Sequence, residues 1–300
     1  MTERYGFLTL ATPRDYLKAI GLALSLRVSN PNVPIAVACS PTLRDRIGRY
    51  FDYVIDEKPE LRGFVHKVHI DDYSPFQETM FFDADVLVFK PVRPYVDAWG
   101  AGPYHACGGY SAVDTSSFGL SRPDVLKKIG KHRLVVIDGA GHAFYRKPDC
   151  AKVFDMARKI TSDYESYAGG AKYADEDVVN ITLTVLDIPP VAYGDFWSRH
   201  LSARAGTMQM DAAAGRCRFI DRDSGQPFEP CMMHFAGKEG PVAHAWQLFK
   251  LFKKFGVPTQ GLLKQVIADV FETKVRWKLG TAKKAIRDLF LIARTSSHSN

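Results

Sequence analysis

One segment carries two carboxylates, one residue apart, at the end of an apolar run. Asp83 and Asp85 flank Ala84 directly after Phe82. Paired carboxylates are ligands that hard divalent cations such as Mg²⁺ and Mn²⁺ prefer, and a cation held this way can bind a diphosphate. A polar turn after a strand gives the same pattern without binding a metal or taking part in a reaction. The pattern therefore indicates either a metal site or a simple turn.

Two other segments combine residue types that could complete such a site. His234 is followed by Gly237 and Lys238; an imidazole can ligate a metal, and a lysine can meet a phosphate as a point charge. A histidine among apolar residues is, however, more often structural. Asp175 and Glu176 begin a helical pattern, where they either cap the helix or contact a substrate hydroxyl.

The first strand-to-helix turn, at residues 9–16, is where nucleotides usually meet open α/β sheets. It contains neither G-x-G-x-x-G nor a P-loop sequence. This argues against a dinucleotide-binding enzyme and against a P-loop NTPase.

The elements that must position these residues alternate between strand and helix along the first part of the chain. Short apolar runs predict strands, and segments with helical periodicity predict helices. The expected strands are 6–10, 33–38, 53–55, 78–82, 134–137 and 143–145, and the expected helices are 14–28, 41–50, 149–160 and 175–183. This order predicts a doubly wound, mostly parallel α/β sheet flanked by helices. Asp83 then lies at the carboxyl end of a strand, where such sheets bind ligands.

The charge of the chain is concentrated at its end. The net charge is +7, but residues 246–300 carry +8 and the rest carries −1. A nucleic-acid enzyme would more often carry basic charge around its main cleft, so we expect no nucleic-acid partner. We expect a catalytic domain at 1–245 and a helical, basic C-terminal region at 246–300, divided into roughly three helices.

In the C-terminal region, lysines alternate with bulky apolar residues. Trp246, Phe249 and Phe252 are interleaved with Lys250 and Lys253. This pattern is typical of a helix lying on an anionic membrane, although such helices could equally pack on the catalytic domain. No run of eighteen apolar residues and no signal peptide is visible, and the five cysteines form no C-x-x-C. We therefore expect a cytoplasmic protein that is peripheral on the inner face of a membrane.

The order and spacing of these motifs resemble one known family. The chain carries Thr9-Leu10-Ala11-Thr12 followed by Tyr16 and Lys18, then Lys67 sixteen residues before Asp83, Phe82-Asp83-Ala84-Asp85, Asp175-Glu176 with Asn180, and His234-Phe235-Ala236-Gly237. In this combination, residues 5 to about 241 resemble the GT-A glycosyltransferases, and among them glycosyltransferase family 8, the group of glycogenin and the bacterial lipopolysaccharide galactosyltransferases.

The resemblance implies a metal-dependent glycosyltransferase. Such an enzyme moves a sugar from a nucleotide-diphosphate donor, here a UDP-sugar, to a glycan or lipid-linked acceptor with retention of configuration. The implied roles are metal binding by Asp83, Asp85 and His234 (Mn²⁺ or Mg²⁺), donor binding by Leu10, Thr12, Tyr16, Lys67, Ala84, Gly237 and Lys238, and contact with the transferred sugar by Asp175 and Glu176, the latter in place of a glutamine.

The chain also departs from the family pattern. An Asn-Ser-Gly segment is replaced by Gly139-Ala140-Gly141, with Asp138 as a partial substitute, and Lys238 stands two positions early in its motif. Two alternative functions remain open from the residues. One is a catalytically inactive nucleotide-sugar-binding module, and the other is a haloacid-dehalogenase-like phosphatase built on Asp83 and Asp85. A sugar-nucleotide pyrophosphorylase would need a glycine-rich, basic first turn, which residues 9–16 do not supply.

Overall fold

A computed structural model describes residues 4–137, 141–235 and 240–271. Asp138, Gly139, Gly237 and Lys238, and the last of the three expected C-terminal helices, lie outside the described residues. The strands are β1 (Tyr5–Ala11), β2 (Ile35–Cys39), β3 (Tyr53–Asp56), β4 (Glu78–Phe82), β5 (Val86–Val88), β6 (Tyr104–His105), β7 (Gly108–Ser111), β8 (Leu134–Ile137), β9 (His142–Arg146), β10 (Trp197–Arg199), β11 (Gln209–Asp211), β12 (Arg216–Ile220), β13 (Pro227–Phe228) and β14 (Met232–His234).

Ten α-helices are described in the same part of the chain. They are α1 (Tyr16–Ser29), α2 (Arg44–Ile47), α3 (Ile70–Tyr73), α4 (Arg93–Ala98), α5 (Arg122–Ile129), α6 (Ala151–Ser162), α7 (Tyr164–Ala168), α8 (Asp175–Val185), α9 (Gly240–Phe255) and α10 (Leu262–Phe271). A 3₁₀ helix, η3 (Gly63–His69), leads directly into α3.

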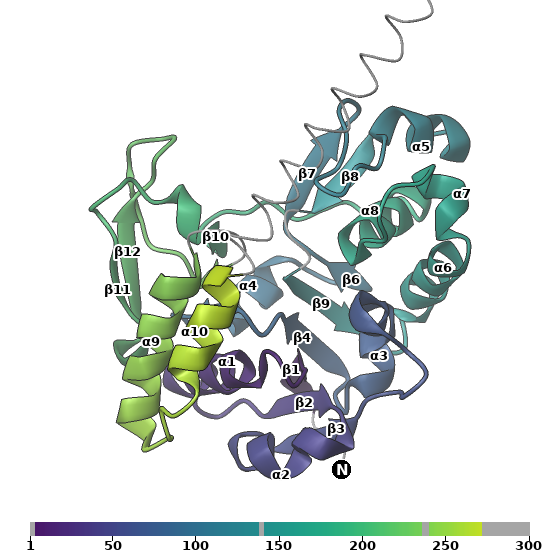
Figure 1. Cartoon of the computed structure of the whole chain (residues 1–300). Coiled ribbons are helices and arrows are strands. Elements are labelled where there is room, and N and C mark those ends of the chain that lie inside the picture. The colour runs from purple at the N-terminus through teal and green to yellow at the C-terminus, as the bar shows by residue number, and fades with distance from the viewer. Residues whose placement is uncertain (1–3, 138–140, 236–239, 272–300) are drawn as a thin grey trace, which may run out of the picture.

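A six-stranded sheet in the order β3-β2-β1-β4-β9-β6 forms the centre of the molecule (Figure 1). The pairings among β3, β2, β1 and β4 are parallel, and β9 runs antiparallel to β4 and β6. The chain proceeds outward from β1 to β2 and β3, then returns to place β4 on the other side of β1. The carboxyl ends of β1 and β4 therefore adjoin where the strand order reverses, which is the position at which such sheets bind ligands.

Both faces of this sheet are buried, as expected for parallel strands covered by helices. Phe7 and Phe82 point into the core shared with α1, and Leu8 and Phe81 point into the core shared with Phe154 of α6. The prediction of a doubly wound, mostly parallel α/β sheet is confirmed. The helix expected at 41–50 differs in detail, because α2 supplies only one turn, with 3₁₀ turns on either side.

The short strand β5 was not expected from the sequence. It follows the Asp83-Ala84-Asp85 turn and pairs antiparallel with β14, which in turn pairs with β10. This second, three-stranded sheet connects the end of β4 to a part of the chain almost 150 residues later.

Helix α9 packs against α1. Its Leu248, Leu251 and Phe252 are buried in the core that contains α1, and a Cβ placed on Gly21 of α1 would lie only 1.9 Å from Cδ2 of Leu248. In Figure 1, α9 and α10 lie beside α1, on the opposite side of the molecule from α6 and α7. Because α9 begins at residue 240, the expected domain boundary at 245 falls inside this helix, and the division of the chain there stays a prediction.

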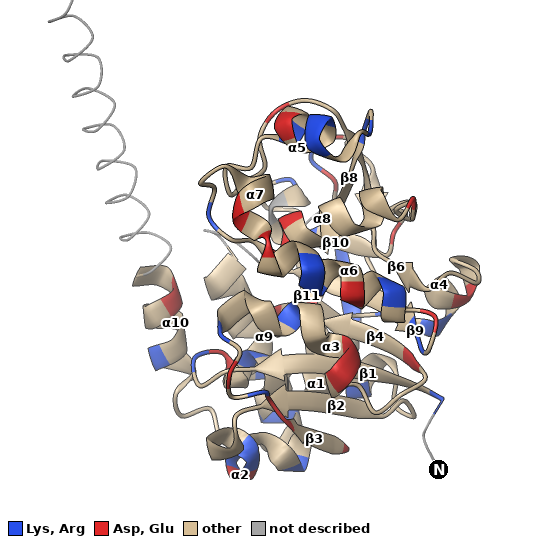
Figure 2. Cartoon of the chain, turned by 90° about the vertical axis from the view of Figure 1, so that its right-hand side faces the viewer, with Lys and Arg blue, Asp and Glu red and all other residues tan. Residues whose placement is uncertain are grey.

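Charges of both signs are interspersed on the face of the molecule that carries α5, α6 and α4 (Figure 2). Within the described ranges, no helix is long and apolar enough to cross a membrane.

Candidate active site

The two carboxylates lie in a tight turn between β4 and β5. The amide of Asp83 donates to the carbonyl of Gly141, at 2.9 Å, and the amide of Val86 donates back to the carbonyl of Asp83, at 3.1 Å. These backbone bonds fix the turn at the carboxyl edge of the sheet, so Asp83 and Asp85 face the place where β1 ends.

The pairing of β5 with β14 brings a histidine to the same place. His234 lies opposite Val86 in the ladder, and its Nε2 is 3.1 Å from Oδ1 of Asp85. One ligand atom from each of Asp83, Asp85 and His234 lies within 4.8 Å of the others. The structure thus brings together the three residues that the resemblance implied as metal ligands.

The surroundings of His234 fit a bound cation. The His234 side chain is buried, and its ring lies so close to Gly141 that a Cβ on that residue would be only 3.0 Å from the ring atom Cε1. Among the described residues, its Nδ1 is buried and has no hydrogen-bond partner. Two carboxylates and an imidazole form a donor set that could hold a divalent metal ion.

A lysine with 15% of its side chain exposed joins this cluster to the next candidate residue. Nζ of Lys67, on η3, lies 2.8 Å from Oδ2 of Asp83 and 2.9 Å from Oδ2 of Asp175. Asp175 is the first residue of α8 and is buried. One ammonium group therefore connects a candidate metal ligand with the carboxylate expected beside the transferred sugar.

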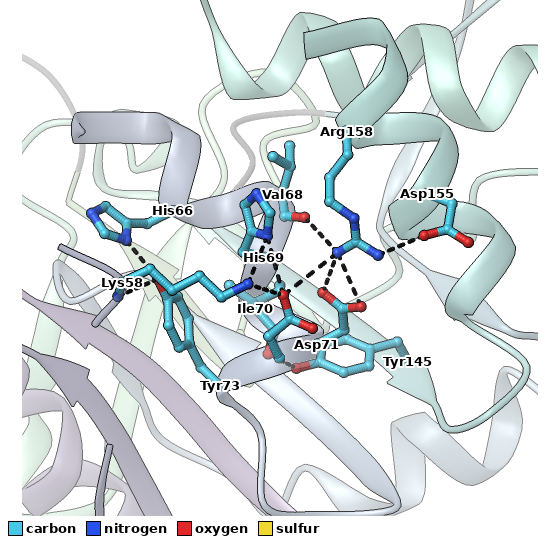
Figure 3. Close-up of polar contacts among 11 residues, drawn as sticks. Lys58, His66, Val68, His69, Ile70, Asp71, Tyr73, Tyr145, Asp155 and Arg158 are labelled. Atoms are coloured by element: carbon cyan, nitrogen blue, oxygen red, sulfur yellow. Dashed lines mark hydrogen bonds and ion pairs between the residues drawn. The ribbon is translucent and has the colours of Figure 1, made fainter. Parts of the chain in front are cut away.

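The segment formed by η3 and α3, which carries Lys67, is anchored by polar contacts with α6 and β9 (Figure 3). Arg158 points from α6 to Asp71 of α3, with Nη1 at 3.0 Å from Oδ1, and the hydroxyl of Tyr145 donates to the carbonyl of Ile70 at 2.7 Å. These bonds hold η3 and α3 against β9 and α6, so they position Lys67 indirectly.

The charges in this cluster shift one another. Burial raises the pKa of Asp83 to about 6, against the opposing effect of Lys67. Burial would also raise the pKa of Asp85, but the charge and hydrogen bond of His234 outweigh it, and that pKa lies well below its ordinary value. Burial would lower the pKa of His234, and Asp85 raises it instead. For Lys67, Asp83 and Asp175 likewise overcome the effect of burial and raise the pKa.

A cavity of about 240 Å³ opens beside the cluster. Its lining residues are Leu10, Thr12, Asp15, Lys18, Gly63, Phe64, Lys67, Asp83, Ala84 and Asp85. Six of the ten were expected in the donor site. A larger cavity of about 580 Å³, between β12 and α9, contains none of the expected residues. We place the candidate site at the smaller cavity, because convergent polar groups distinguish a site better than size does.

Some expected residues lie apart from this cavity. Tyr16 does not line it, because its hydroxyl accepts from Nη2 of Arg46 at 2.9 Å and its ring stacks under the same guanidinium. Glu176, the second residue of α8, is half-buried. Burial is the main cause that raises the pKa of Tyr193, and the charges of Cys107 and Glu176 raise it further.

Sequence reasoning missed several residues of the site. Asp15 accepts the amide of Thr12 at 2.6 Å and so shapes the first turn. Phe64 is half-exposed at the cavity, and the centroid of its ring lies 5.6 Å from Nζ of Lys67. No motif in the surrounding sequence indicates this residue. Lys18 belonged to the opening motif without a role assigned to it.

No protein-family model and no curated protein sequence matches the chain. Solved structures of similar fold include the galactosyltransferase LgtC in complex with donor and acceptor sugar analogues, with a TM-score of 0.55 and 17% identity over 85% of this chain and 98% of that one. The bifunctional glycosyltransferase WbbM matches with a TM-score of 0.58 and 12% identity over 88% of this chain and 52% of that one. The glycosyltransferase GlyE of Streptococcus pneumoniae matches with a TM-score of 0.51 and 12% identity over 87% of this chain and 66% of that one. The chain thus has the GT-A fold of these glycosyltransferases, which confirms the fold implied by the resemblance.

Proposed function

We propose that this chain is a metal-dependent glycosyltransferase that takes a sugar from a nucleoside-diphosphate donor, a UDP-sugar, and transfers it to a glycan or glycolipid acceptor with retention. The observation that carries the proposal is the cluster of Asp83, Asp85 and His234, within 4.8 Å of one another, at the edge of the cavity where the strand order reverses. The fold shared with LgtC, WbbM and GlyE supports it.

In this proposal Asp83, Asp85 and His234 hold Mn²⁺ or Mg²⁺. A divalent cation there supplies the positive charge that makes the nucleoside diphosphate a better leaving group. Leu10 and Thr12 line the end of the cavity formed by β1 and contact the nucleoside. Asp175 presents a buried carboxylate that stabilises the positive charge developing on the sugar, and Lys67 keeps that carboxylate aligned with Asp83.

The test is thermal unfolding of the whole chain with UDP, GDP, ADP or CMP, each with and without Mn²⁺. We expect UDP to raise the melting temperature only when Mn²⁺ is present, and we expect Asp83→Asn to abolish the shift. A shift with another nucleotide would keep the metal-dependent site and exclude the UDP assignment. No shift with any nucleotide would contradict the proposal.

Hydrolysis of UDP-sugars by the same preparation then separates an active transferase from an inactive binding module. A nucleotide-binding chain that hydrolyses none of a panel of UDP-sugars, with or without acceptor, would support the inactive module. Release of phosphate from simple phosphomonoesters would instead favour the phosphatase.

We propose further that α9 and α10 dock on an anionic membrane surface, at the cytoplasmic side, where a lipid-linked acceptor would be found. The side chains of Trp246 and Phe249 on α9, and of Leu263 and Ile267 on α10, are exposed even though the opposite face of α9 is buried. Lys253 and Lys264 are exposed on the same two helices, whereas Lys250 and Lys254 donate to the carbonyls of Met210 and Ala213. Each cation near an anionic surface contributes about 1 kcal/mol to binding.

Co-sedimentation with vesicles tests this docking. We expect the whole chain to bind vesicles containing phosphatidylglycerol and not vesicles of phosphatidylcholine alone. The double variant Trp246→Ser and Phe249→Ser should weaken binding while the nucleotide-dependent thermal shift stays unchanged. Equal binding of both vesicle types would contradict the docking and leave the transferase proposal intact.

A further inference from the structure

Two lysines line the candidate donor cavity among the described residues, and they differ in how their charges are compensated. Lys67 lies between two carboxylates, those of Asp83 and Asp175. Lys18, in the first turn of α1, forms one ion pair, with Nζ at 2.8 Å from Oδ2 of Asp269. The two cations therefore have different capacities to accept a further negative charge.

The partner of Lys18 comes from a distant part of the chain. Asp269 lies on α10, and its carboxylate is 92% shielded from solvent, since only 8% of the side chain is exposed. Its other oxygen, Oδ1, accepts from Nε2 of Gln265 at 3.1 Å. This pairing holds the ammonium of Lys18 in a defined place, with 19% of the side chain exposed.

An ammonium group has three N–H donors. Among the described residues, the carboxylate of Asp269 is the one group that forms an ion pair with Lys18, so donors remain for a ligand. Lys18 also lines the same cavity as Asp83 and Asp85, the two carboxylates of the candidate metal cluster. A ligand in the cavity that places negative charge beside Asp85 therefore meets Lys18.

We propose that Lys18 binds the diphosphate of the donor, and that Asp269 of α10 is the positioning residue that holds Lys18 for this task. The proposal rests on the proposed nucleotide-sugar function and extends it, because it makes α10, which follows the expected catalytic domain, a part of the donor site. Lys18 donates hydrogen bonds to phosphate oxygens, and one of its N–H groups continues to donate to the carboxylate of Asp269.

The test measures the dissociation constants of UDP and of uridine, both with saturating Mn²⁺, by calorimetry for UDP and by ligand-observed NMR for uridine. In Lys18→Met we expect UDP to bind roughly tenfold or more weakly, which corresponds to loss of one charge-assisted hydrogen bond. Uridine, which has no phosphate, should bind as in the wild type. Lys18→Arg should recover most of the UDP affinity, since it restores the charge.

Asp269→Asn retains the charge of Lys18 and removes only its anchor. We expect a smaller loss of UDP affinity than in Lys18→Met, again without any effect on uridine. A merely structural role of Asp269 would weaken both ligands together. Unchanged UDP affinity in Asp269→Asn overturns the positioning role.

Lys18→Met leaves a buried carboxylate unpaired and could therefore unfold α10. The double variant Lys18→Met with Asp269→Leu removes both charges and should show the same selective loss of UDP affinity. Lys131→Met, at the exposed pair of Lys131 with Asp187, is the control for the change in net charge and should bind UDP normally.

The outcomes separate this inference from the proposed function. A wild-type chain that binds no nucleoside diphosphate overturns both. If the wild-type chain binds UDP with Mn²⁺, and the folded double variant Lys18→Met with Asp269→Leu binds UDP equally well, only the role of Lys18 is overturned.

Discussion

The Nε2 atom of His234 lies 3.1 Å from Oδ1 of Asp85, although 149 positions separate the two residues in the chain. The antiparallel pairing of β5 with β14 produces this contact, because it sets His234 opposite Val86, the residue after Asp85. The candidate metal site is therefore assembled by a ladder of only three residues on each strand.

This contact predicts a loss of metal affinity when the imidazole is removed. His234→Ala should weaken Mn²⁺ binding at least about tenfold, measured by calorimetry without nucleotide. His132→Gln, an exposed histidine far from the cluster in sequence, is the control and should bind Mn²⁺ normally. Equal Mn²⁺ affinity in the wild type and His234→Ala would mean that His234 is not a ligand.

Lys67 should matter for turnover. Lys67→Met removes the ammonium that lies within 3 Å of both Asp83 and Asp175, so the two carboxylates repel each other and lose their alignment. We expect turnover at saturating donor and metal to fall by about 10²-fold, comparable to other losses of positioning. Lys67→Arg should recover part of it. If Lys67→Met changes only the KM for the donor, Lys67 binds the donor without aligning the carboxylates.

Arg158 should stabilise the segment that carries Lys67 (Figure 3). Arg158→Met leaves the largely buried carboxylate of Asp71 without its partner and should lower the free energy of unfolding by about 1–3 kcal/mol. Arg44→Met, which breaks an exposed ion pair with Asp56, should change it by less than about 1 kcal/mol. Denaturant titrations of both variants measure the difference, and equal effects would contradict the anchoring role of Arg158.

The contact between α1 and α9 should tolerate no added carbon at Gly21. Gly21→Ala places a methyl group where Cδ2 of Leu248 lies, so the buried Leu248 side chain must change its position or α9 must shift. We expect a loss of about 1–3 kcal/mol in the free energy of unfolding, as for other overpacked cores. Because the two side chains would occupy the same space, the double variant Gly21→Ala with Leu248→Ala should lose less than the sum of the two single losses. An unchanged free energy of unfolding in Gly21→Ala would mean that the Leu248 side chain accommodates the methyl group without loss of packing.

His105 should make the fold sensitive to acid. Burial, together with the charge of Arg146, lowers the pKa of His105 to about 4, from an ordinary value of 6.5. Its Nε2 accepts from the amide of Gly102 at 3.1 Å, so the folded protein requires the neutral imidazole. The unfolded chain takes up the proton first, and the free energy of unfolding should fall as the pH decreases from 6.5 towards 4, by up to about 1.4 kcal/mol per pH unit.

His105→Gln retains an acceptor but does not titrate in this range. Denaturant titrations at several pH values should therefore show a shallower decrease for His105→Gln than for the wild type. Parallel curves for the two proteins would show that His105 does not account for the acid sensitivity.

Local patterns in the sequence were enough to predict much of the fold. Apolar runs and helical periodicity predict β1, β2, β4, α1 and α8 to within two or three residues, because burial against a sheet or a helix imposes a short repeat on the chain. The carboxylates of Asp83 and Asp85 were predictable for the same reason, since they follow a recognisable strand and form a contiguous motif.

Contacts between distant segments left no such repeat. Strands β5 and β14 have three residues each, too few to show alternation, and the pairing of Lys18 with Asp269 joins two helices that are about 250 positions apart. The burial of one face of α9 depends on the absence of a side chain at Gly21, which no pattern in α9 itself reveals. The residue types of the candidate metal site and of the proposed diphosphate site are thus visible in the sequence, but their approach to one another follows from the packing of segments that are far apart along the chain.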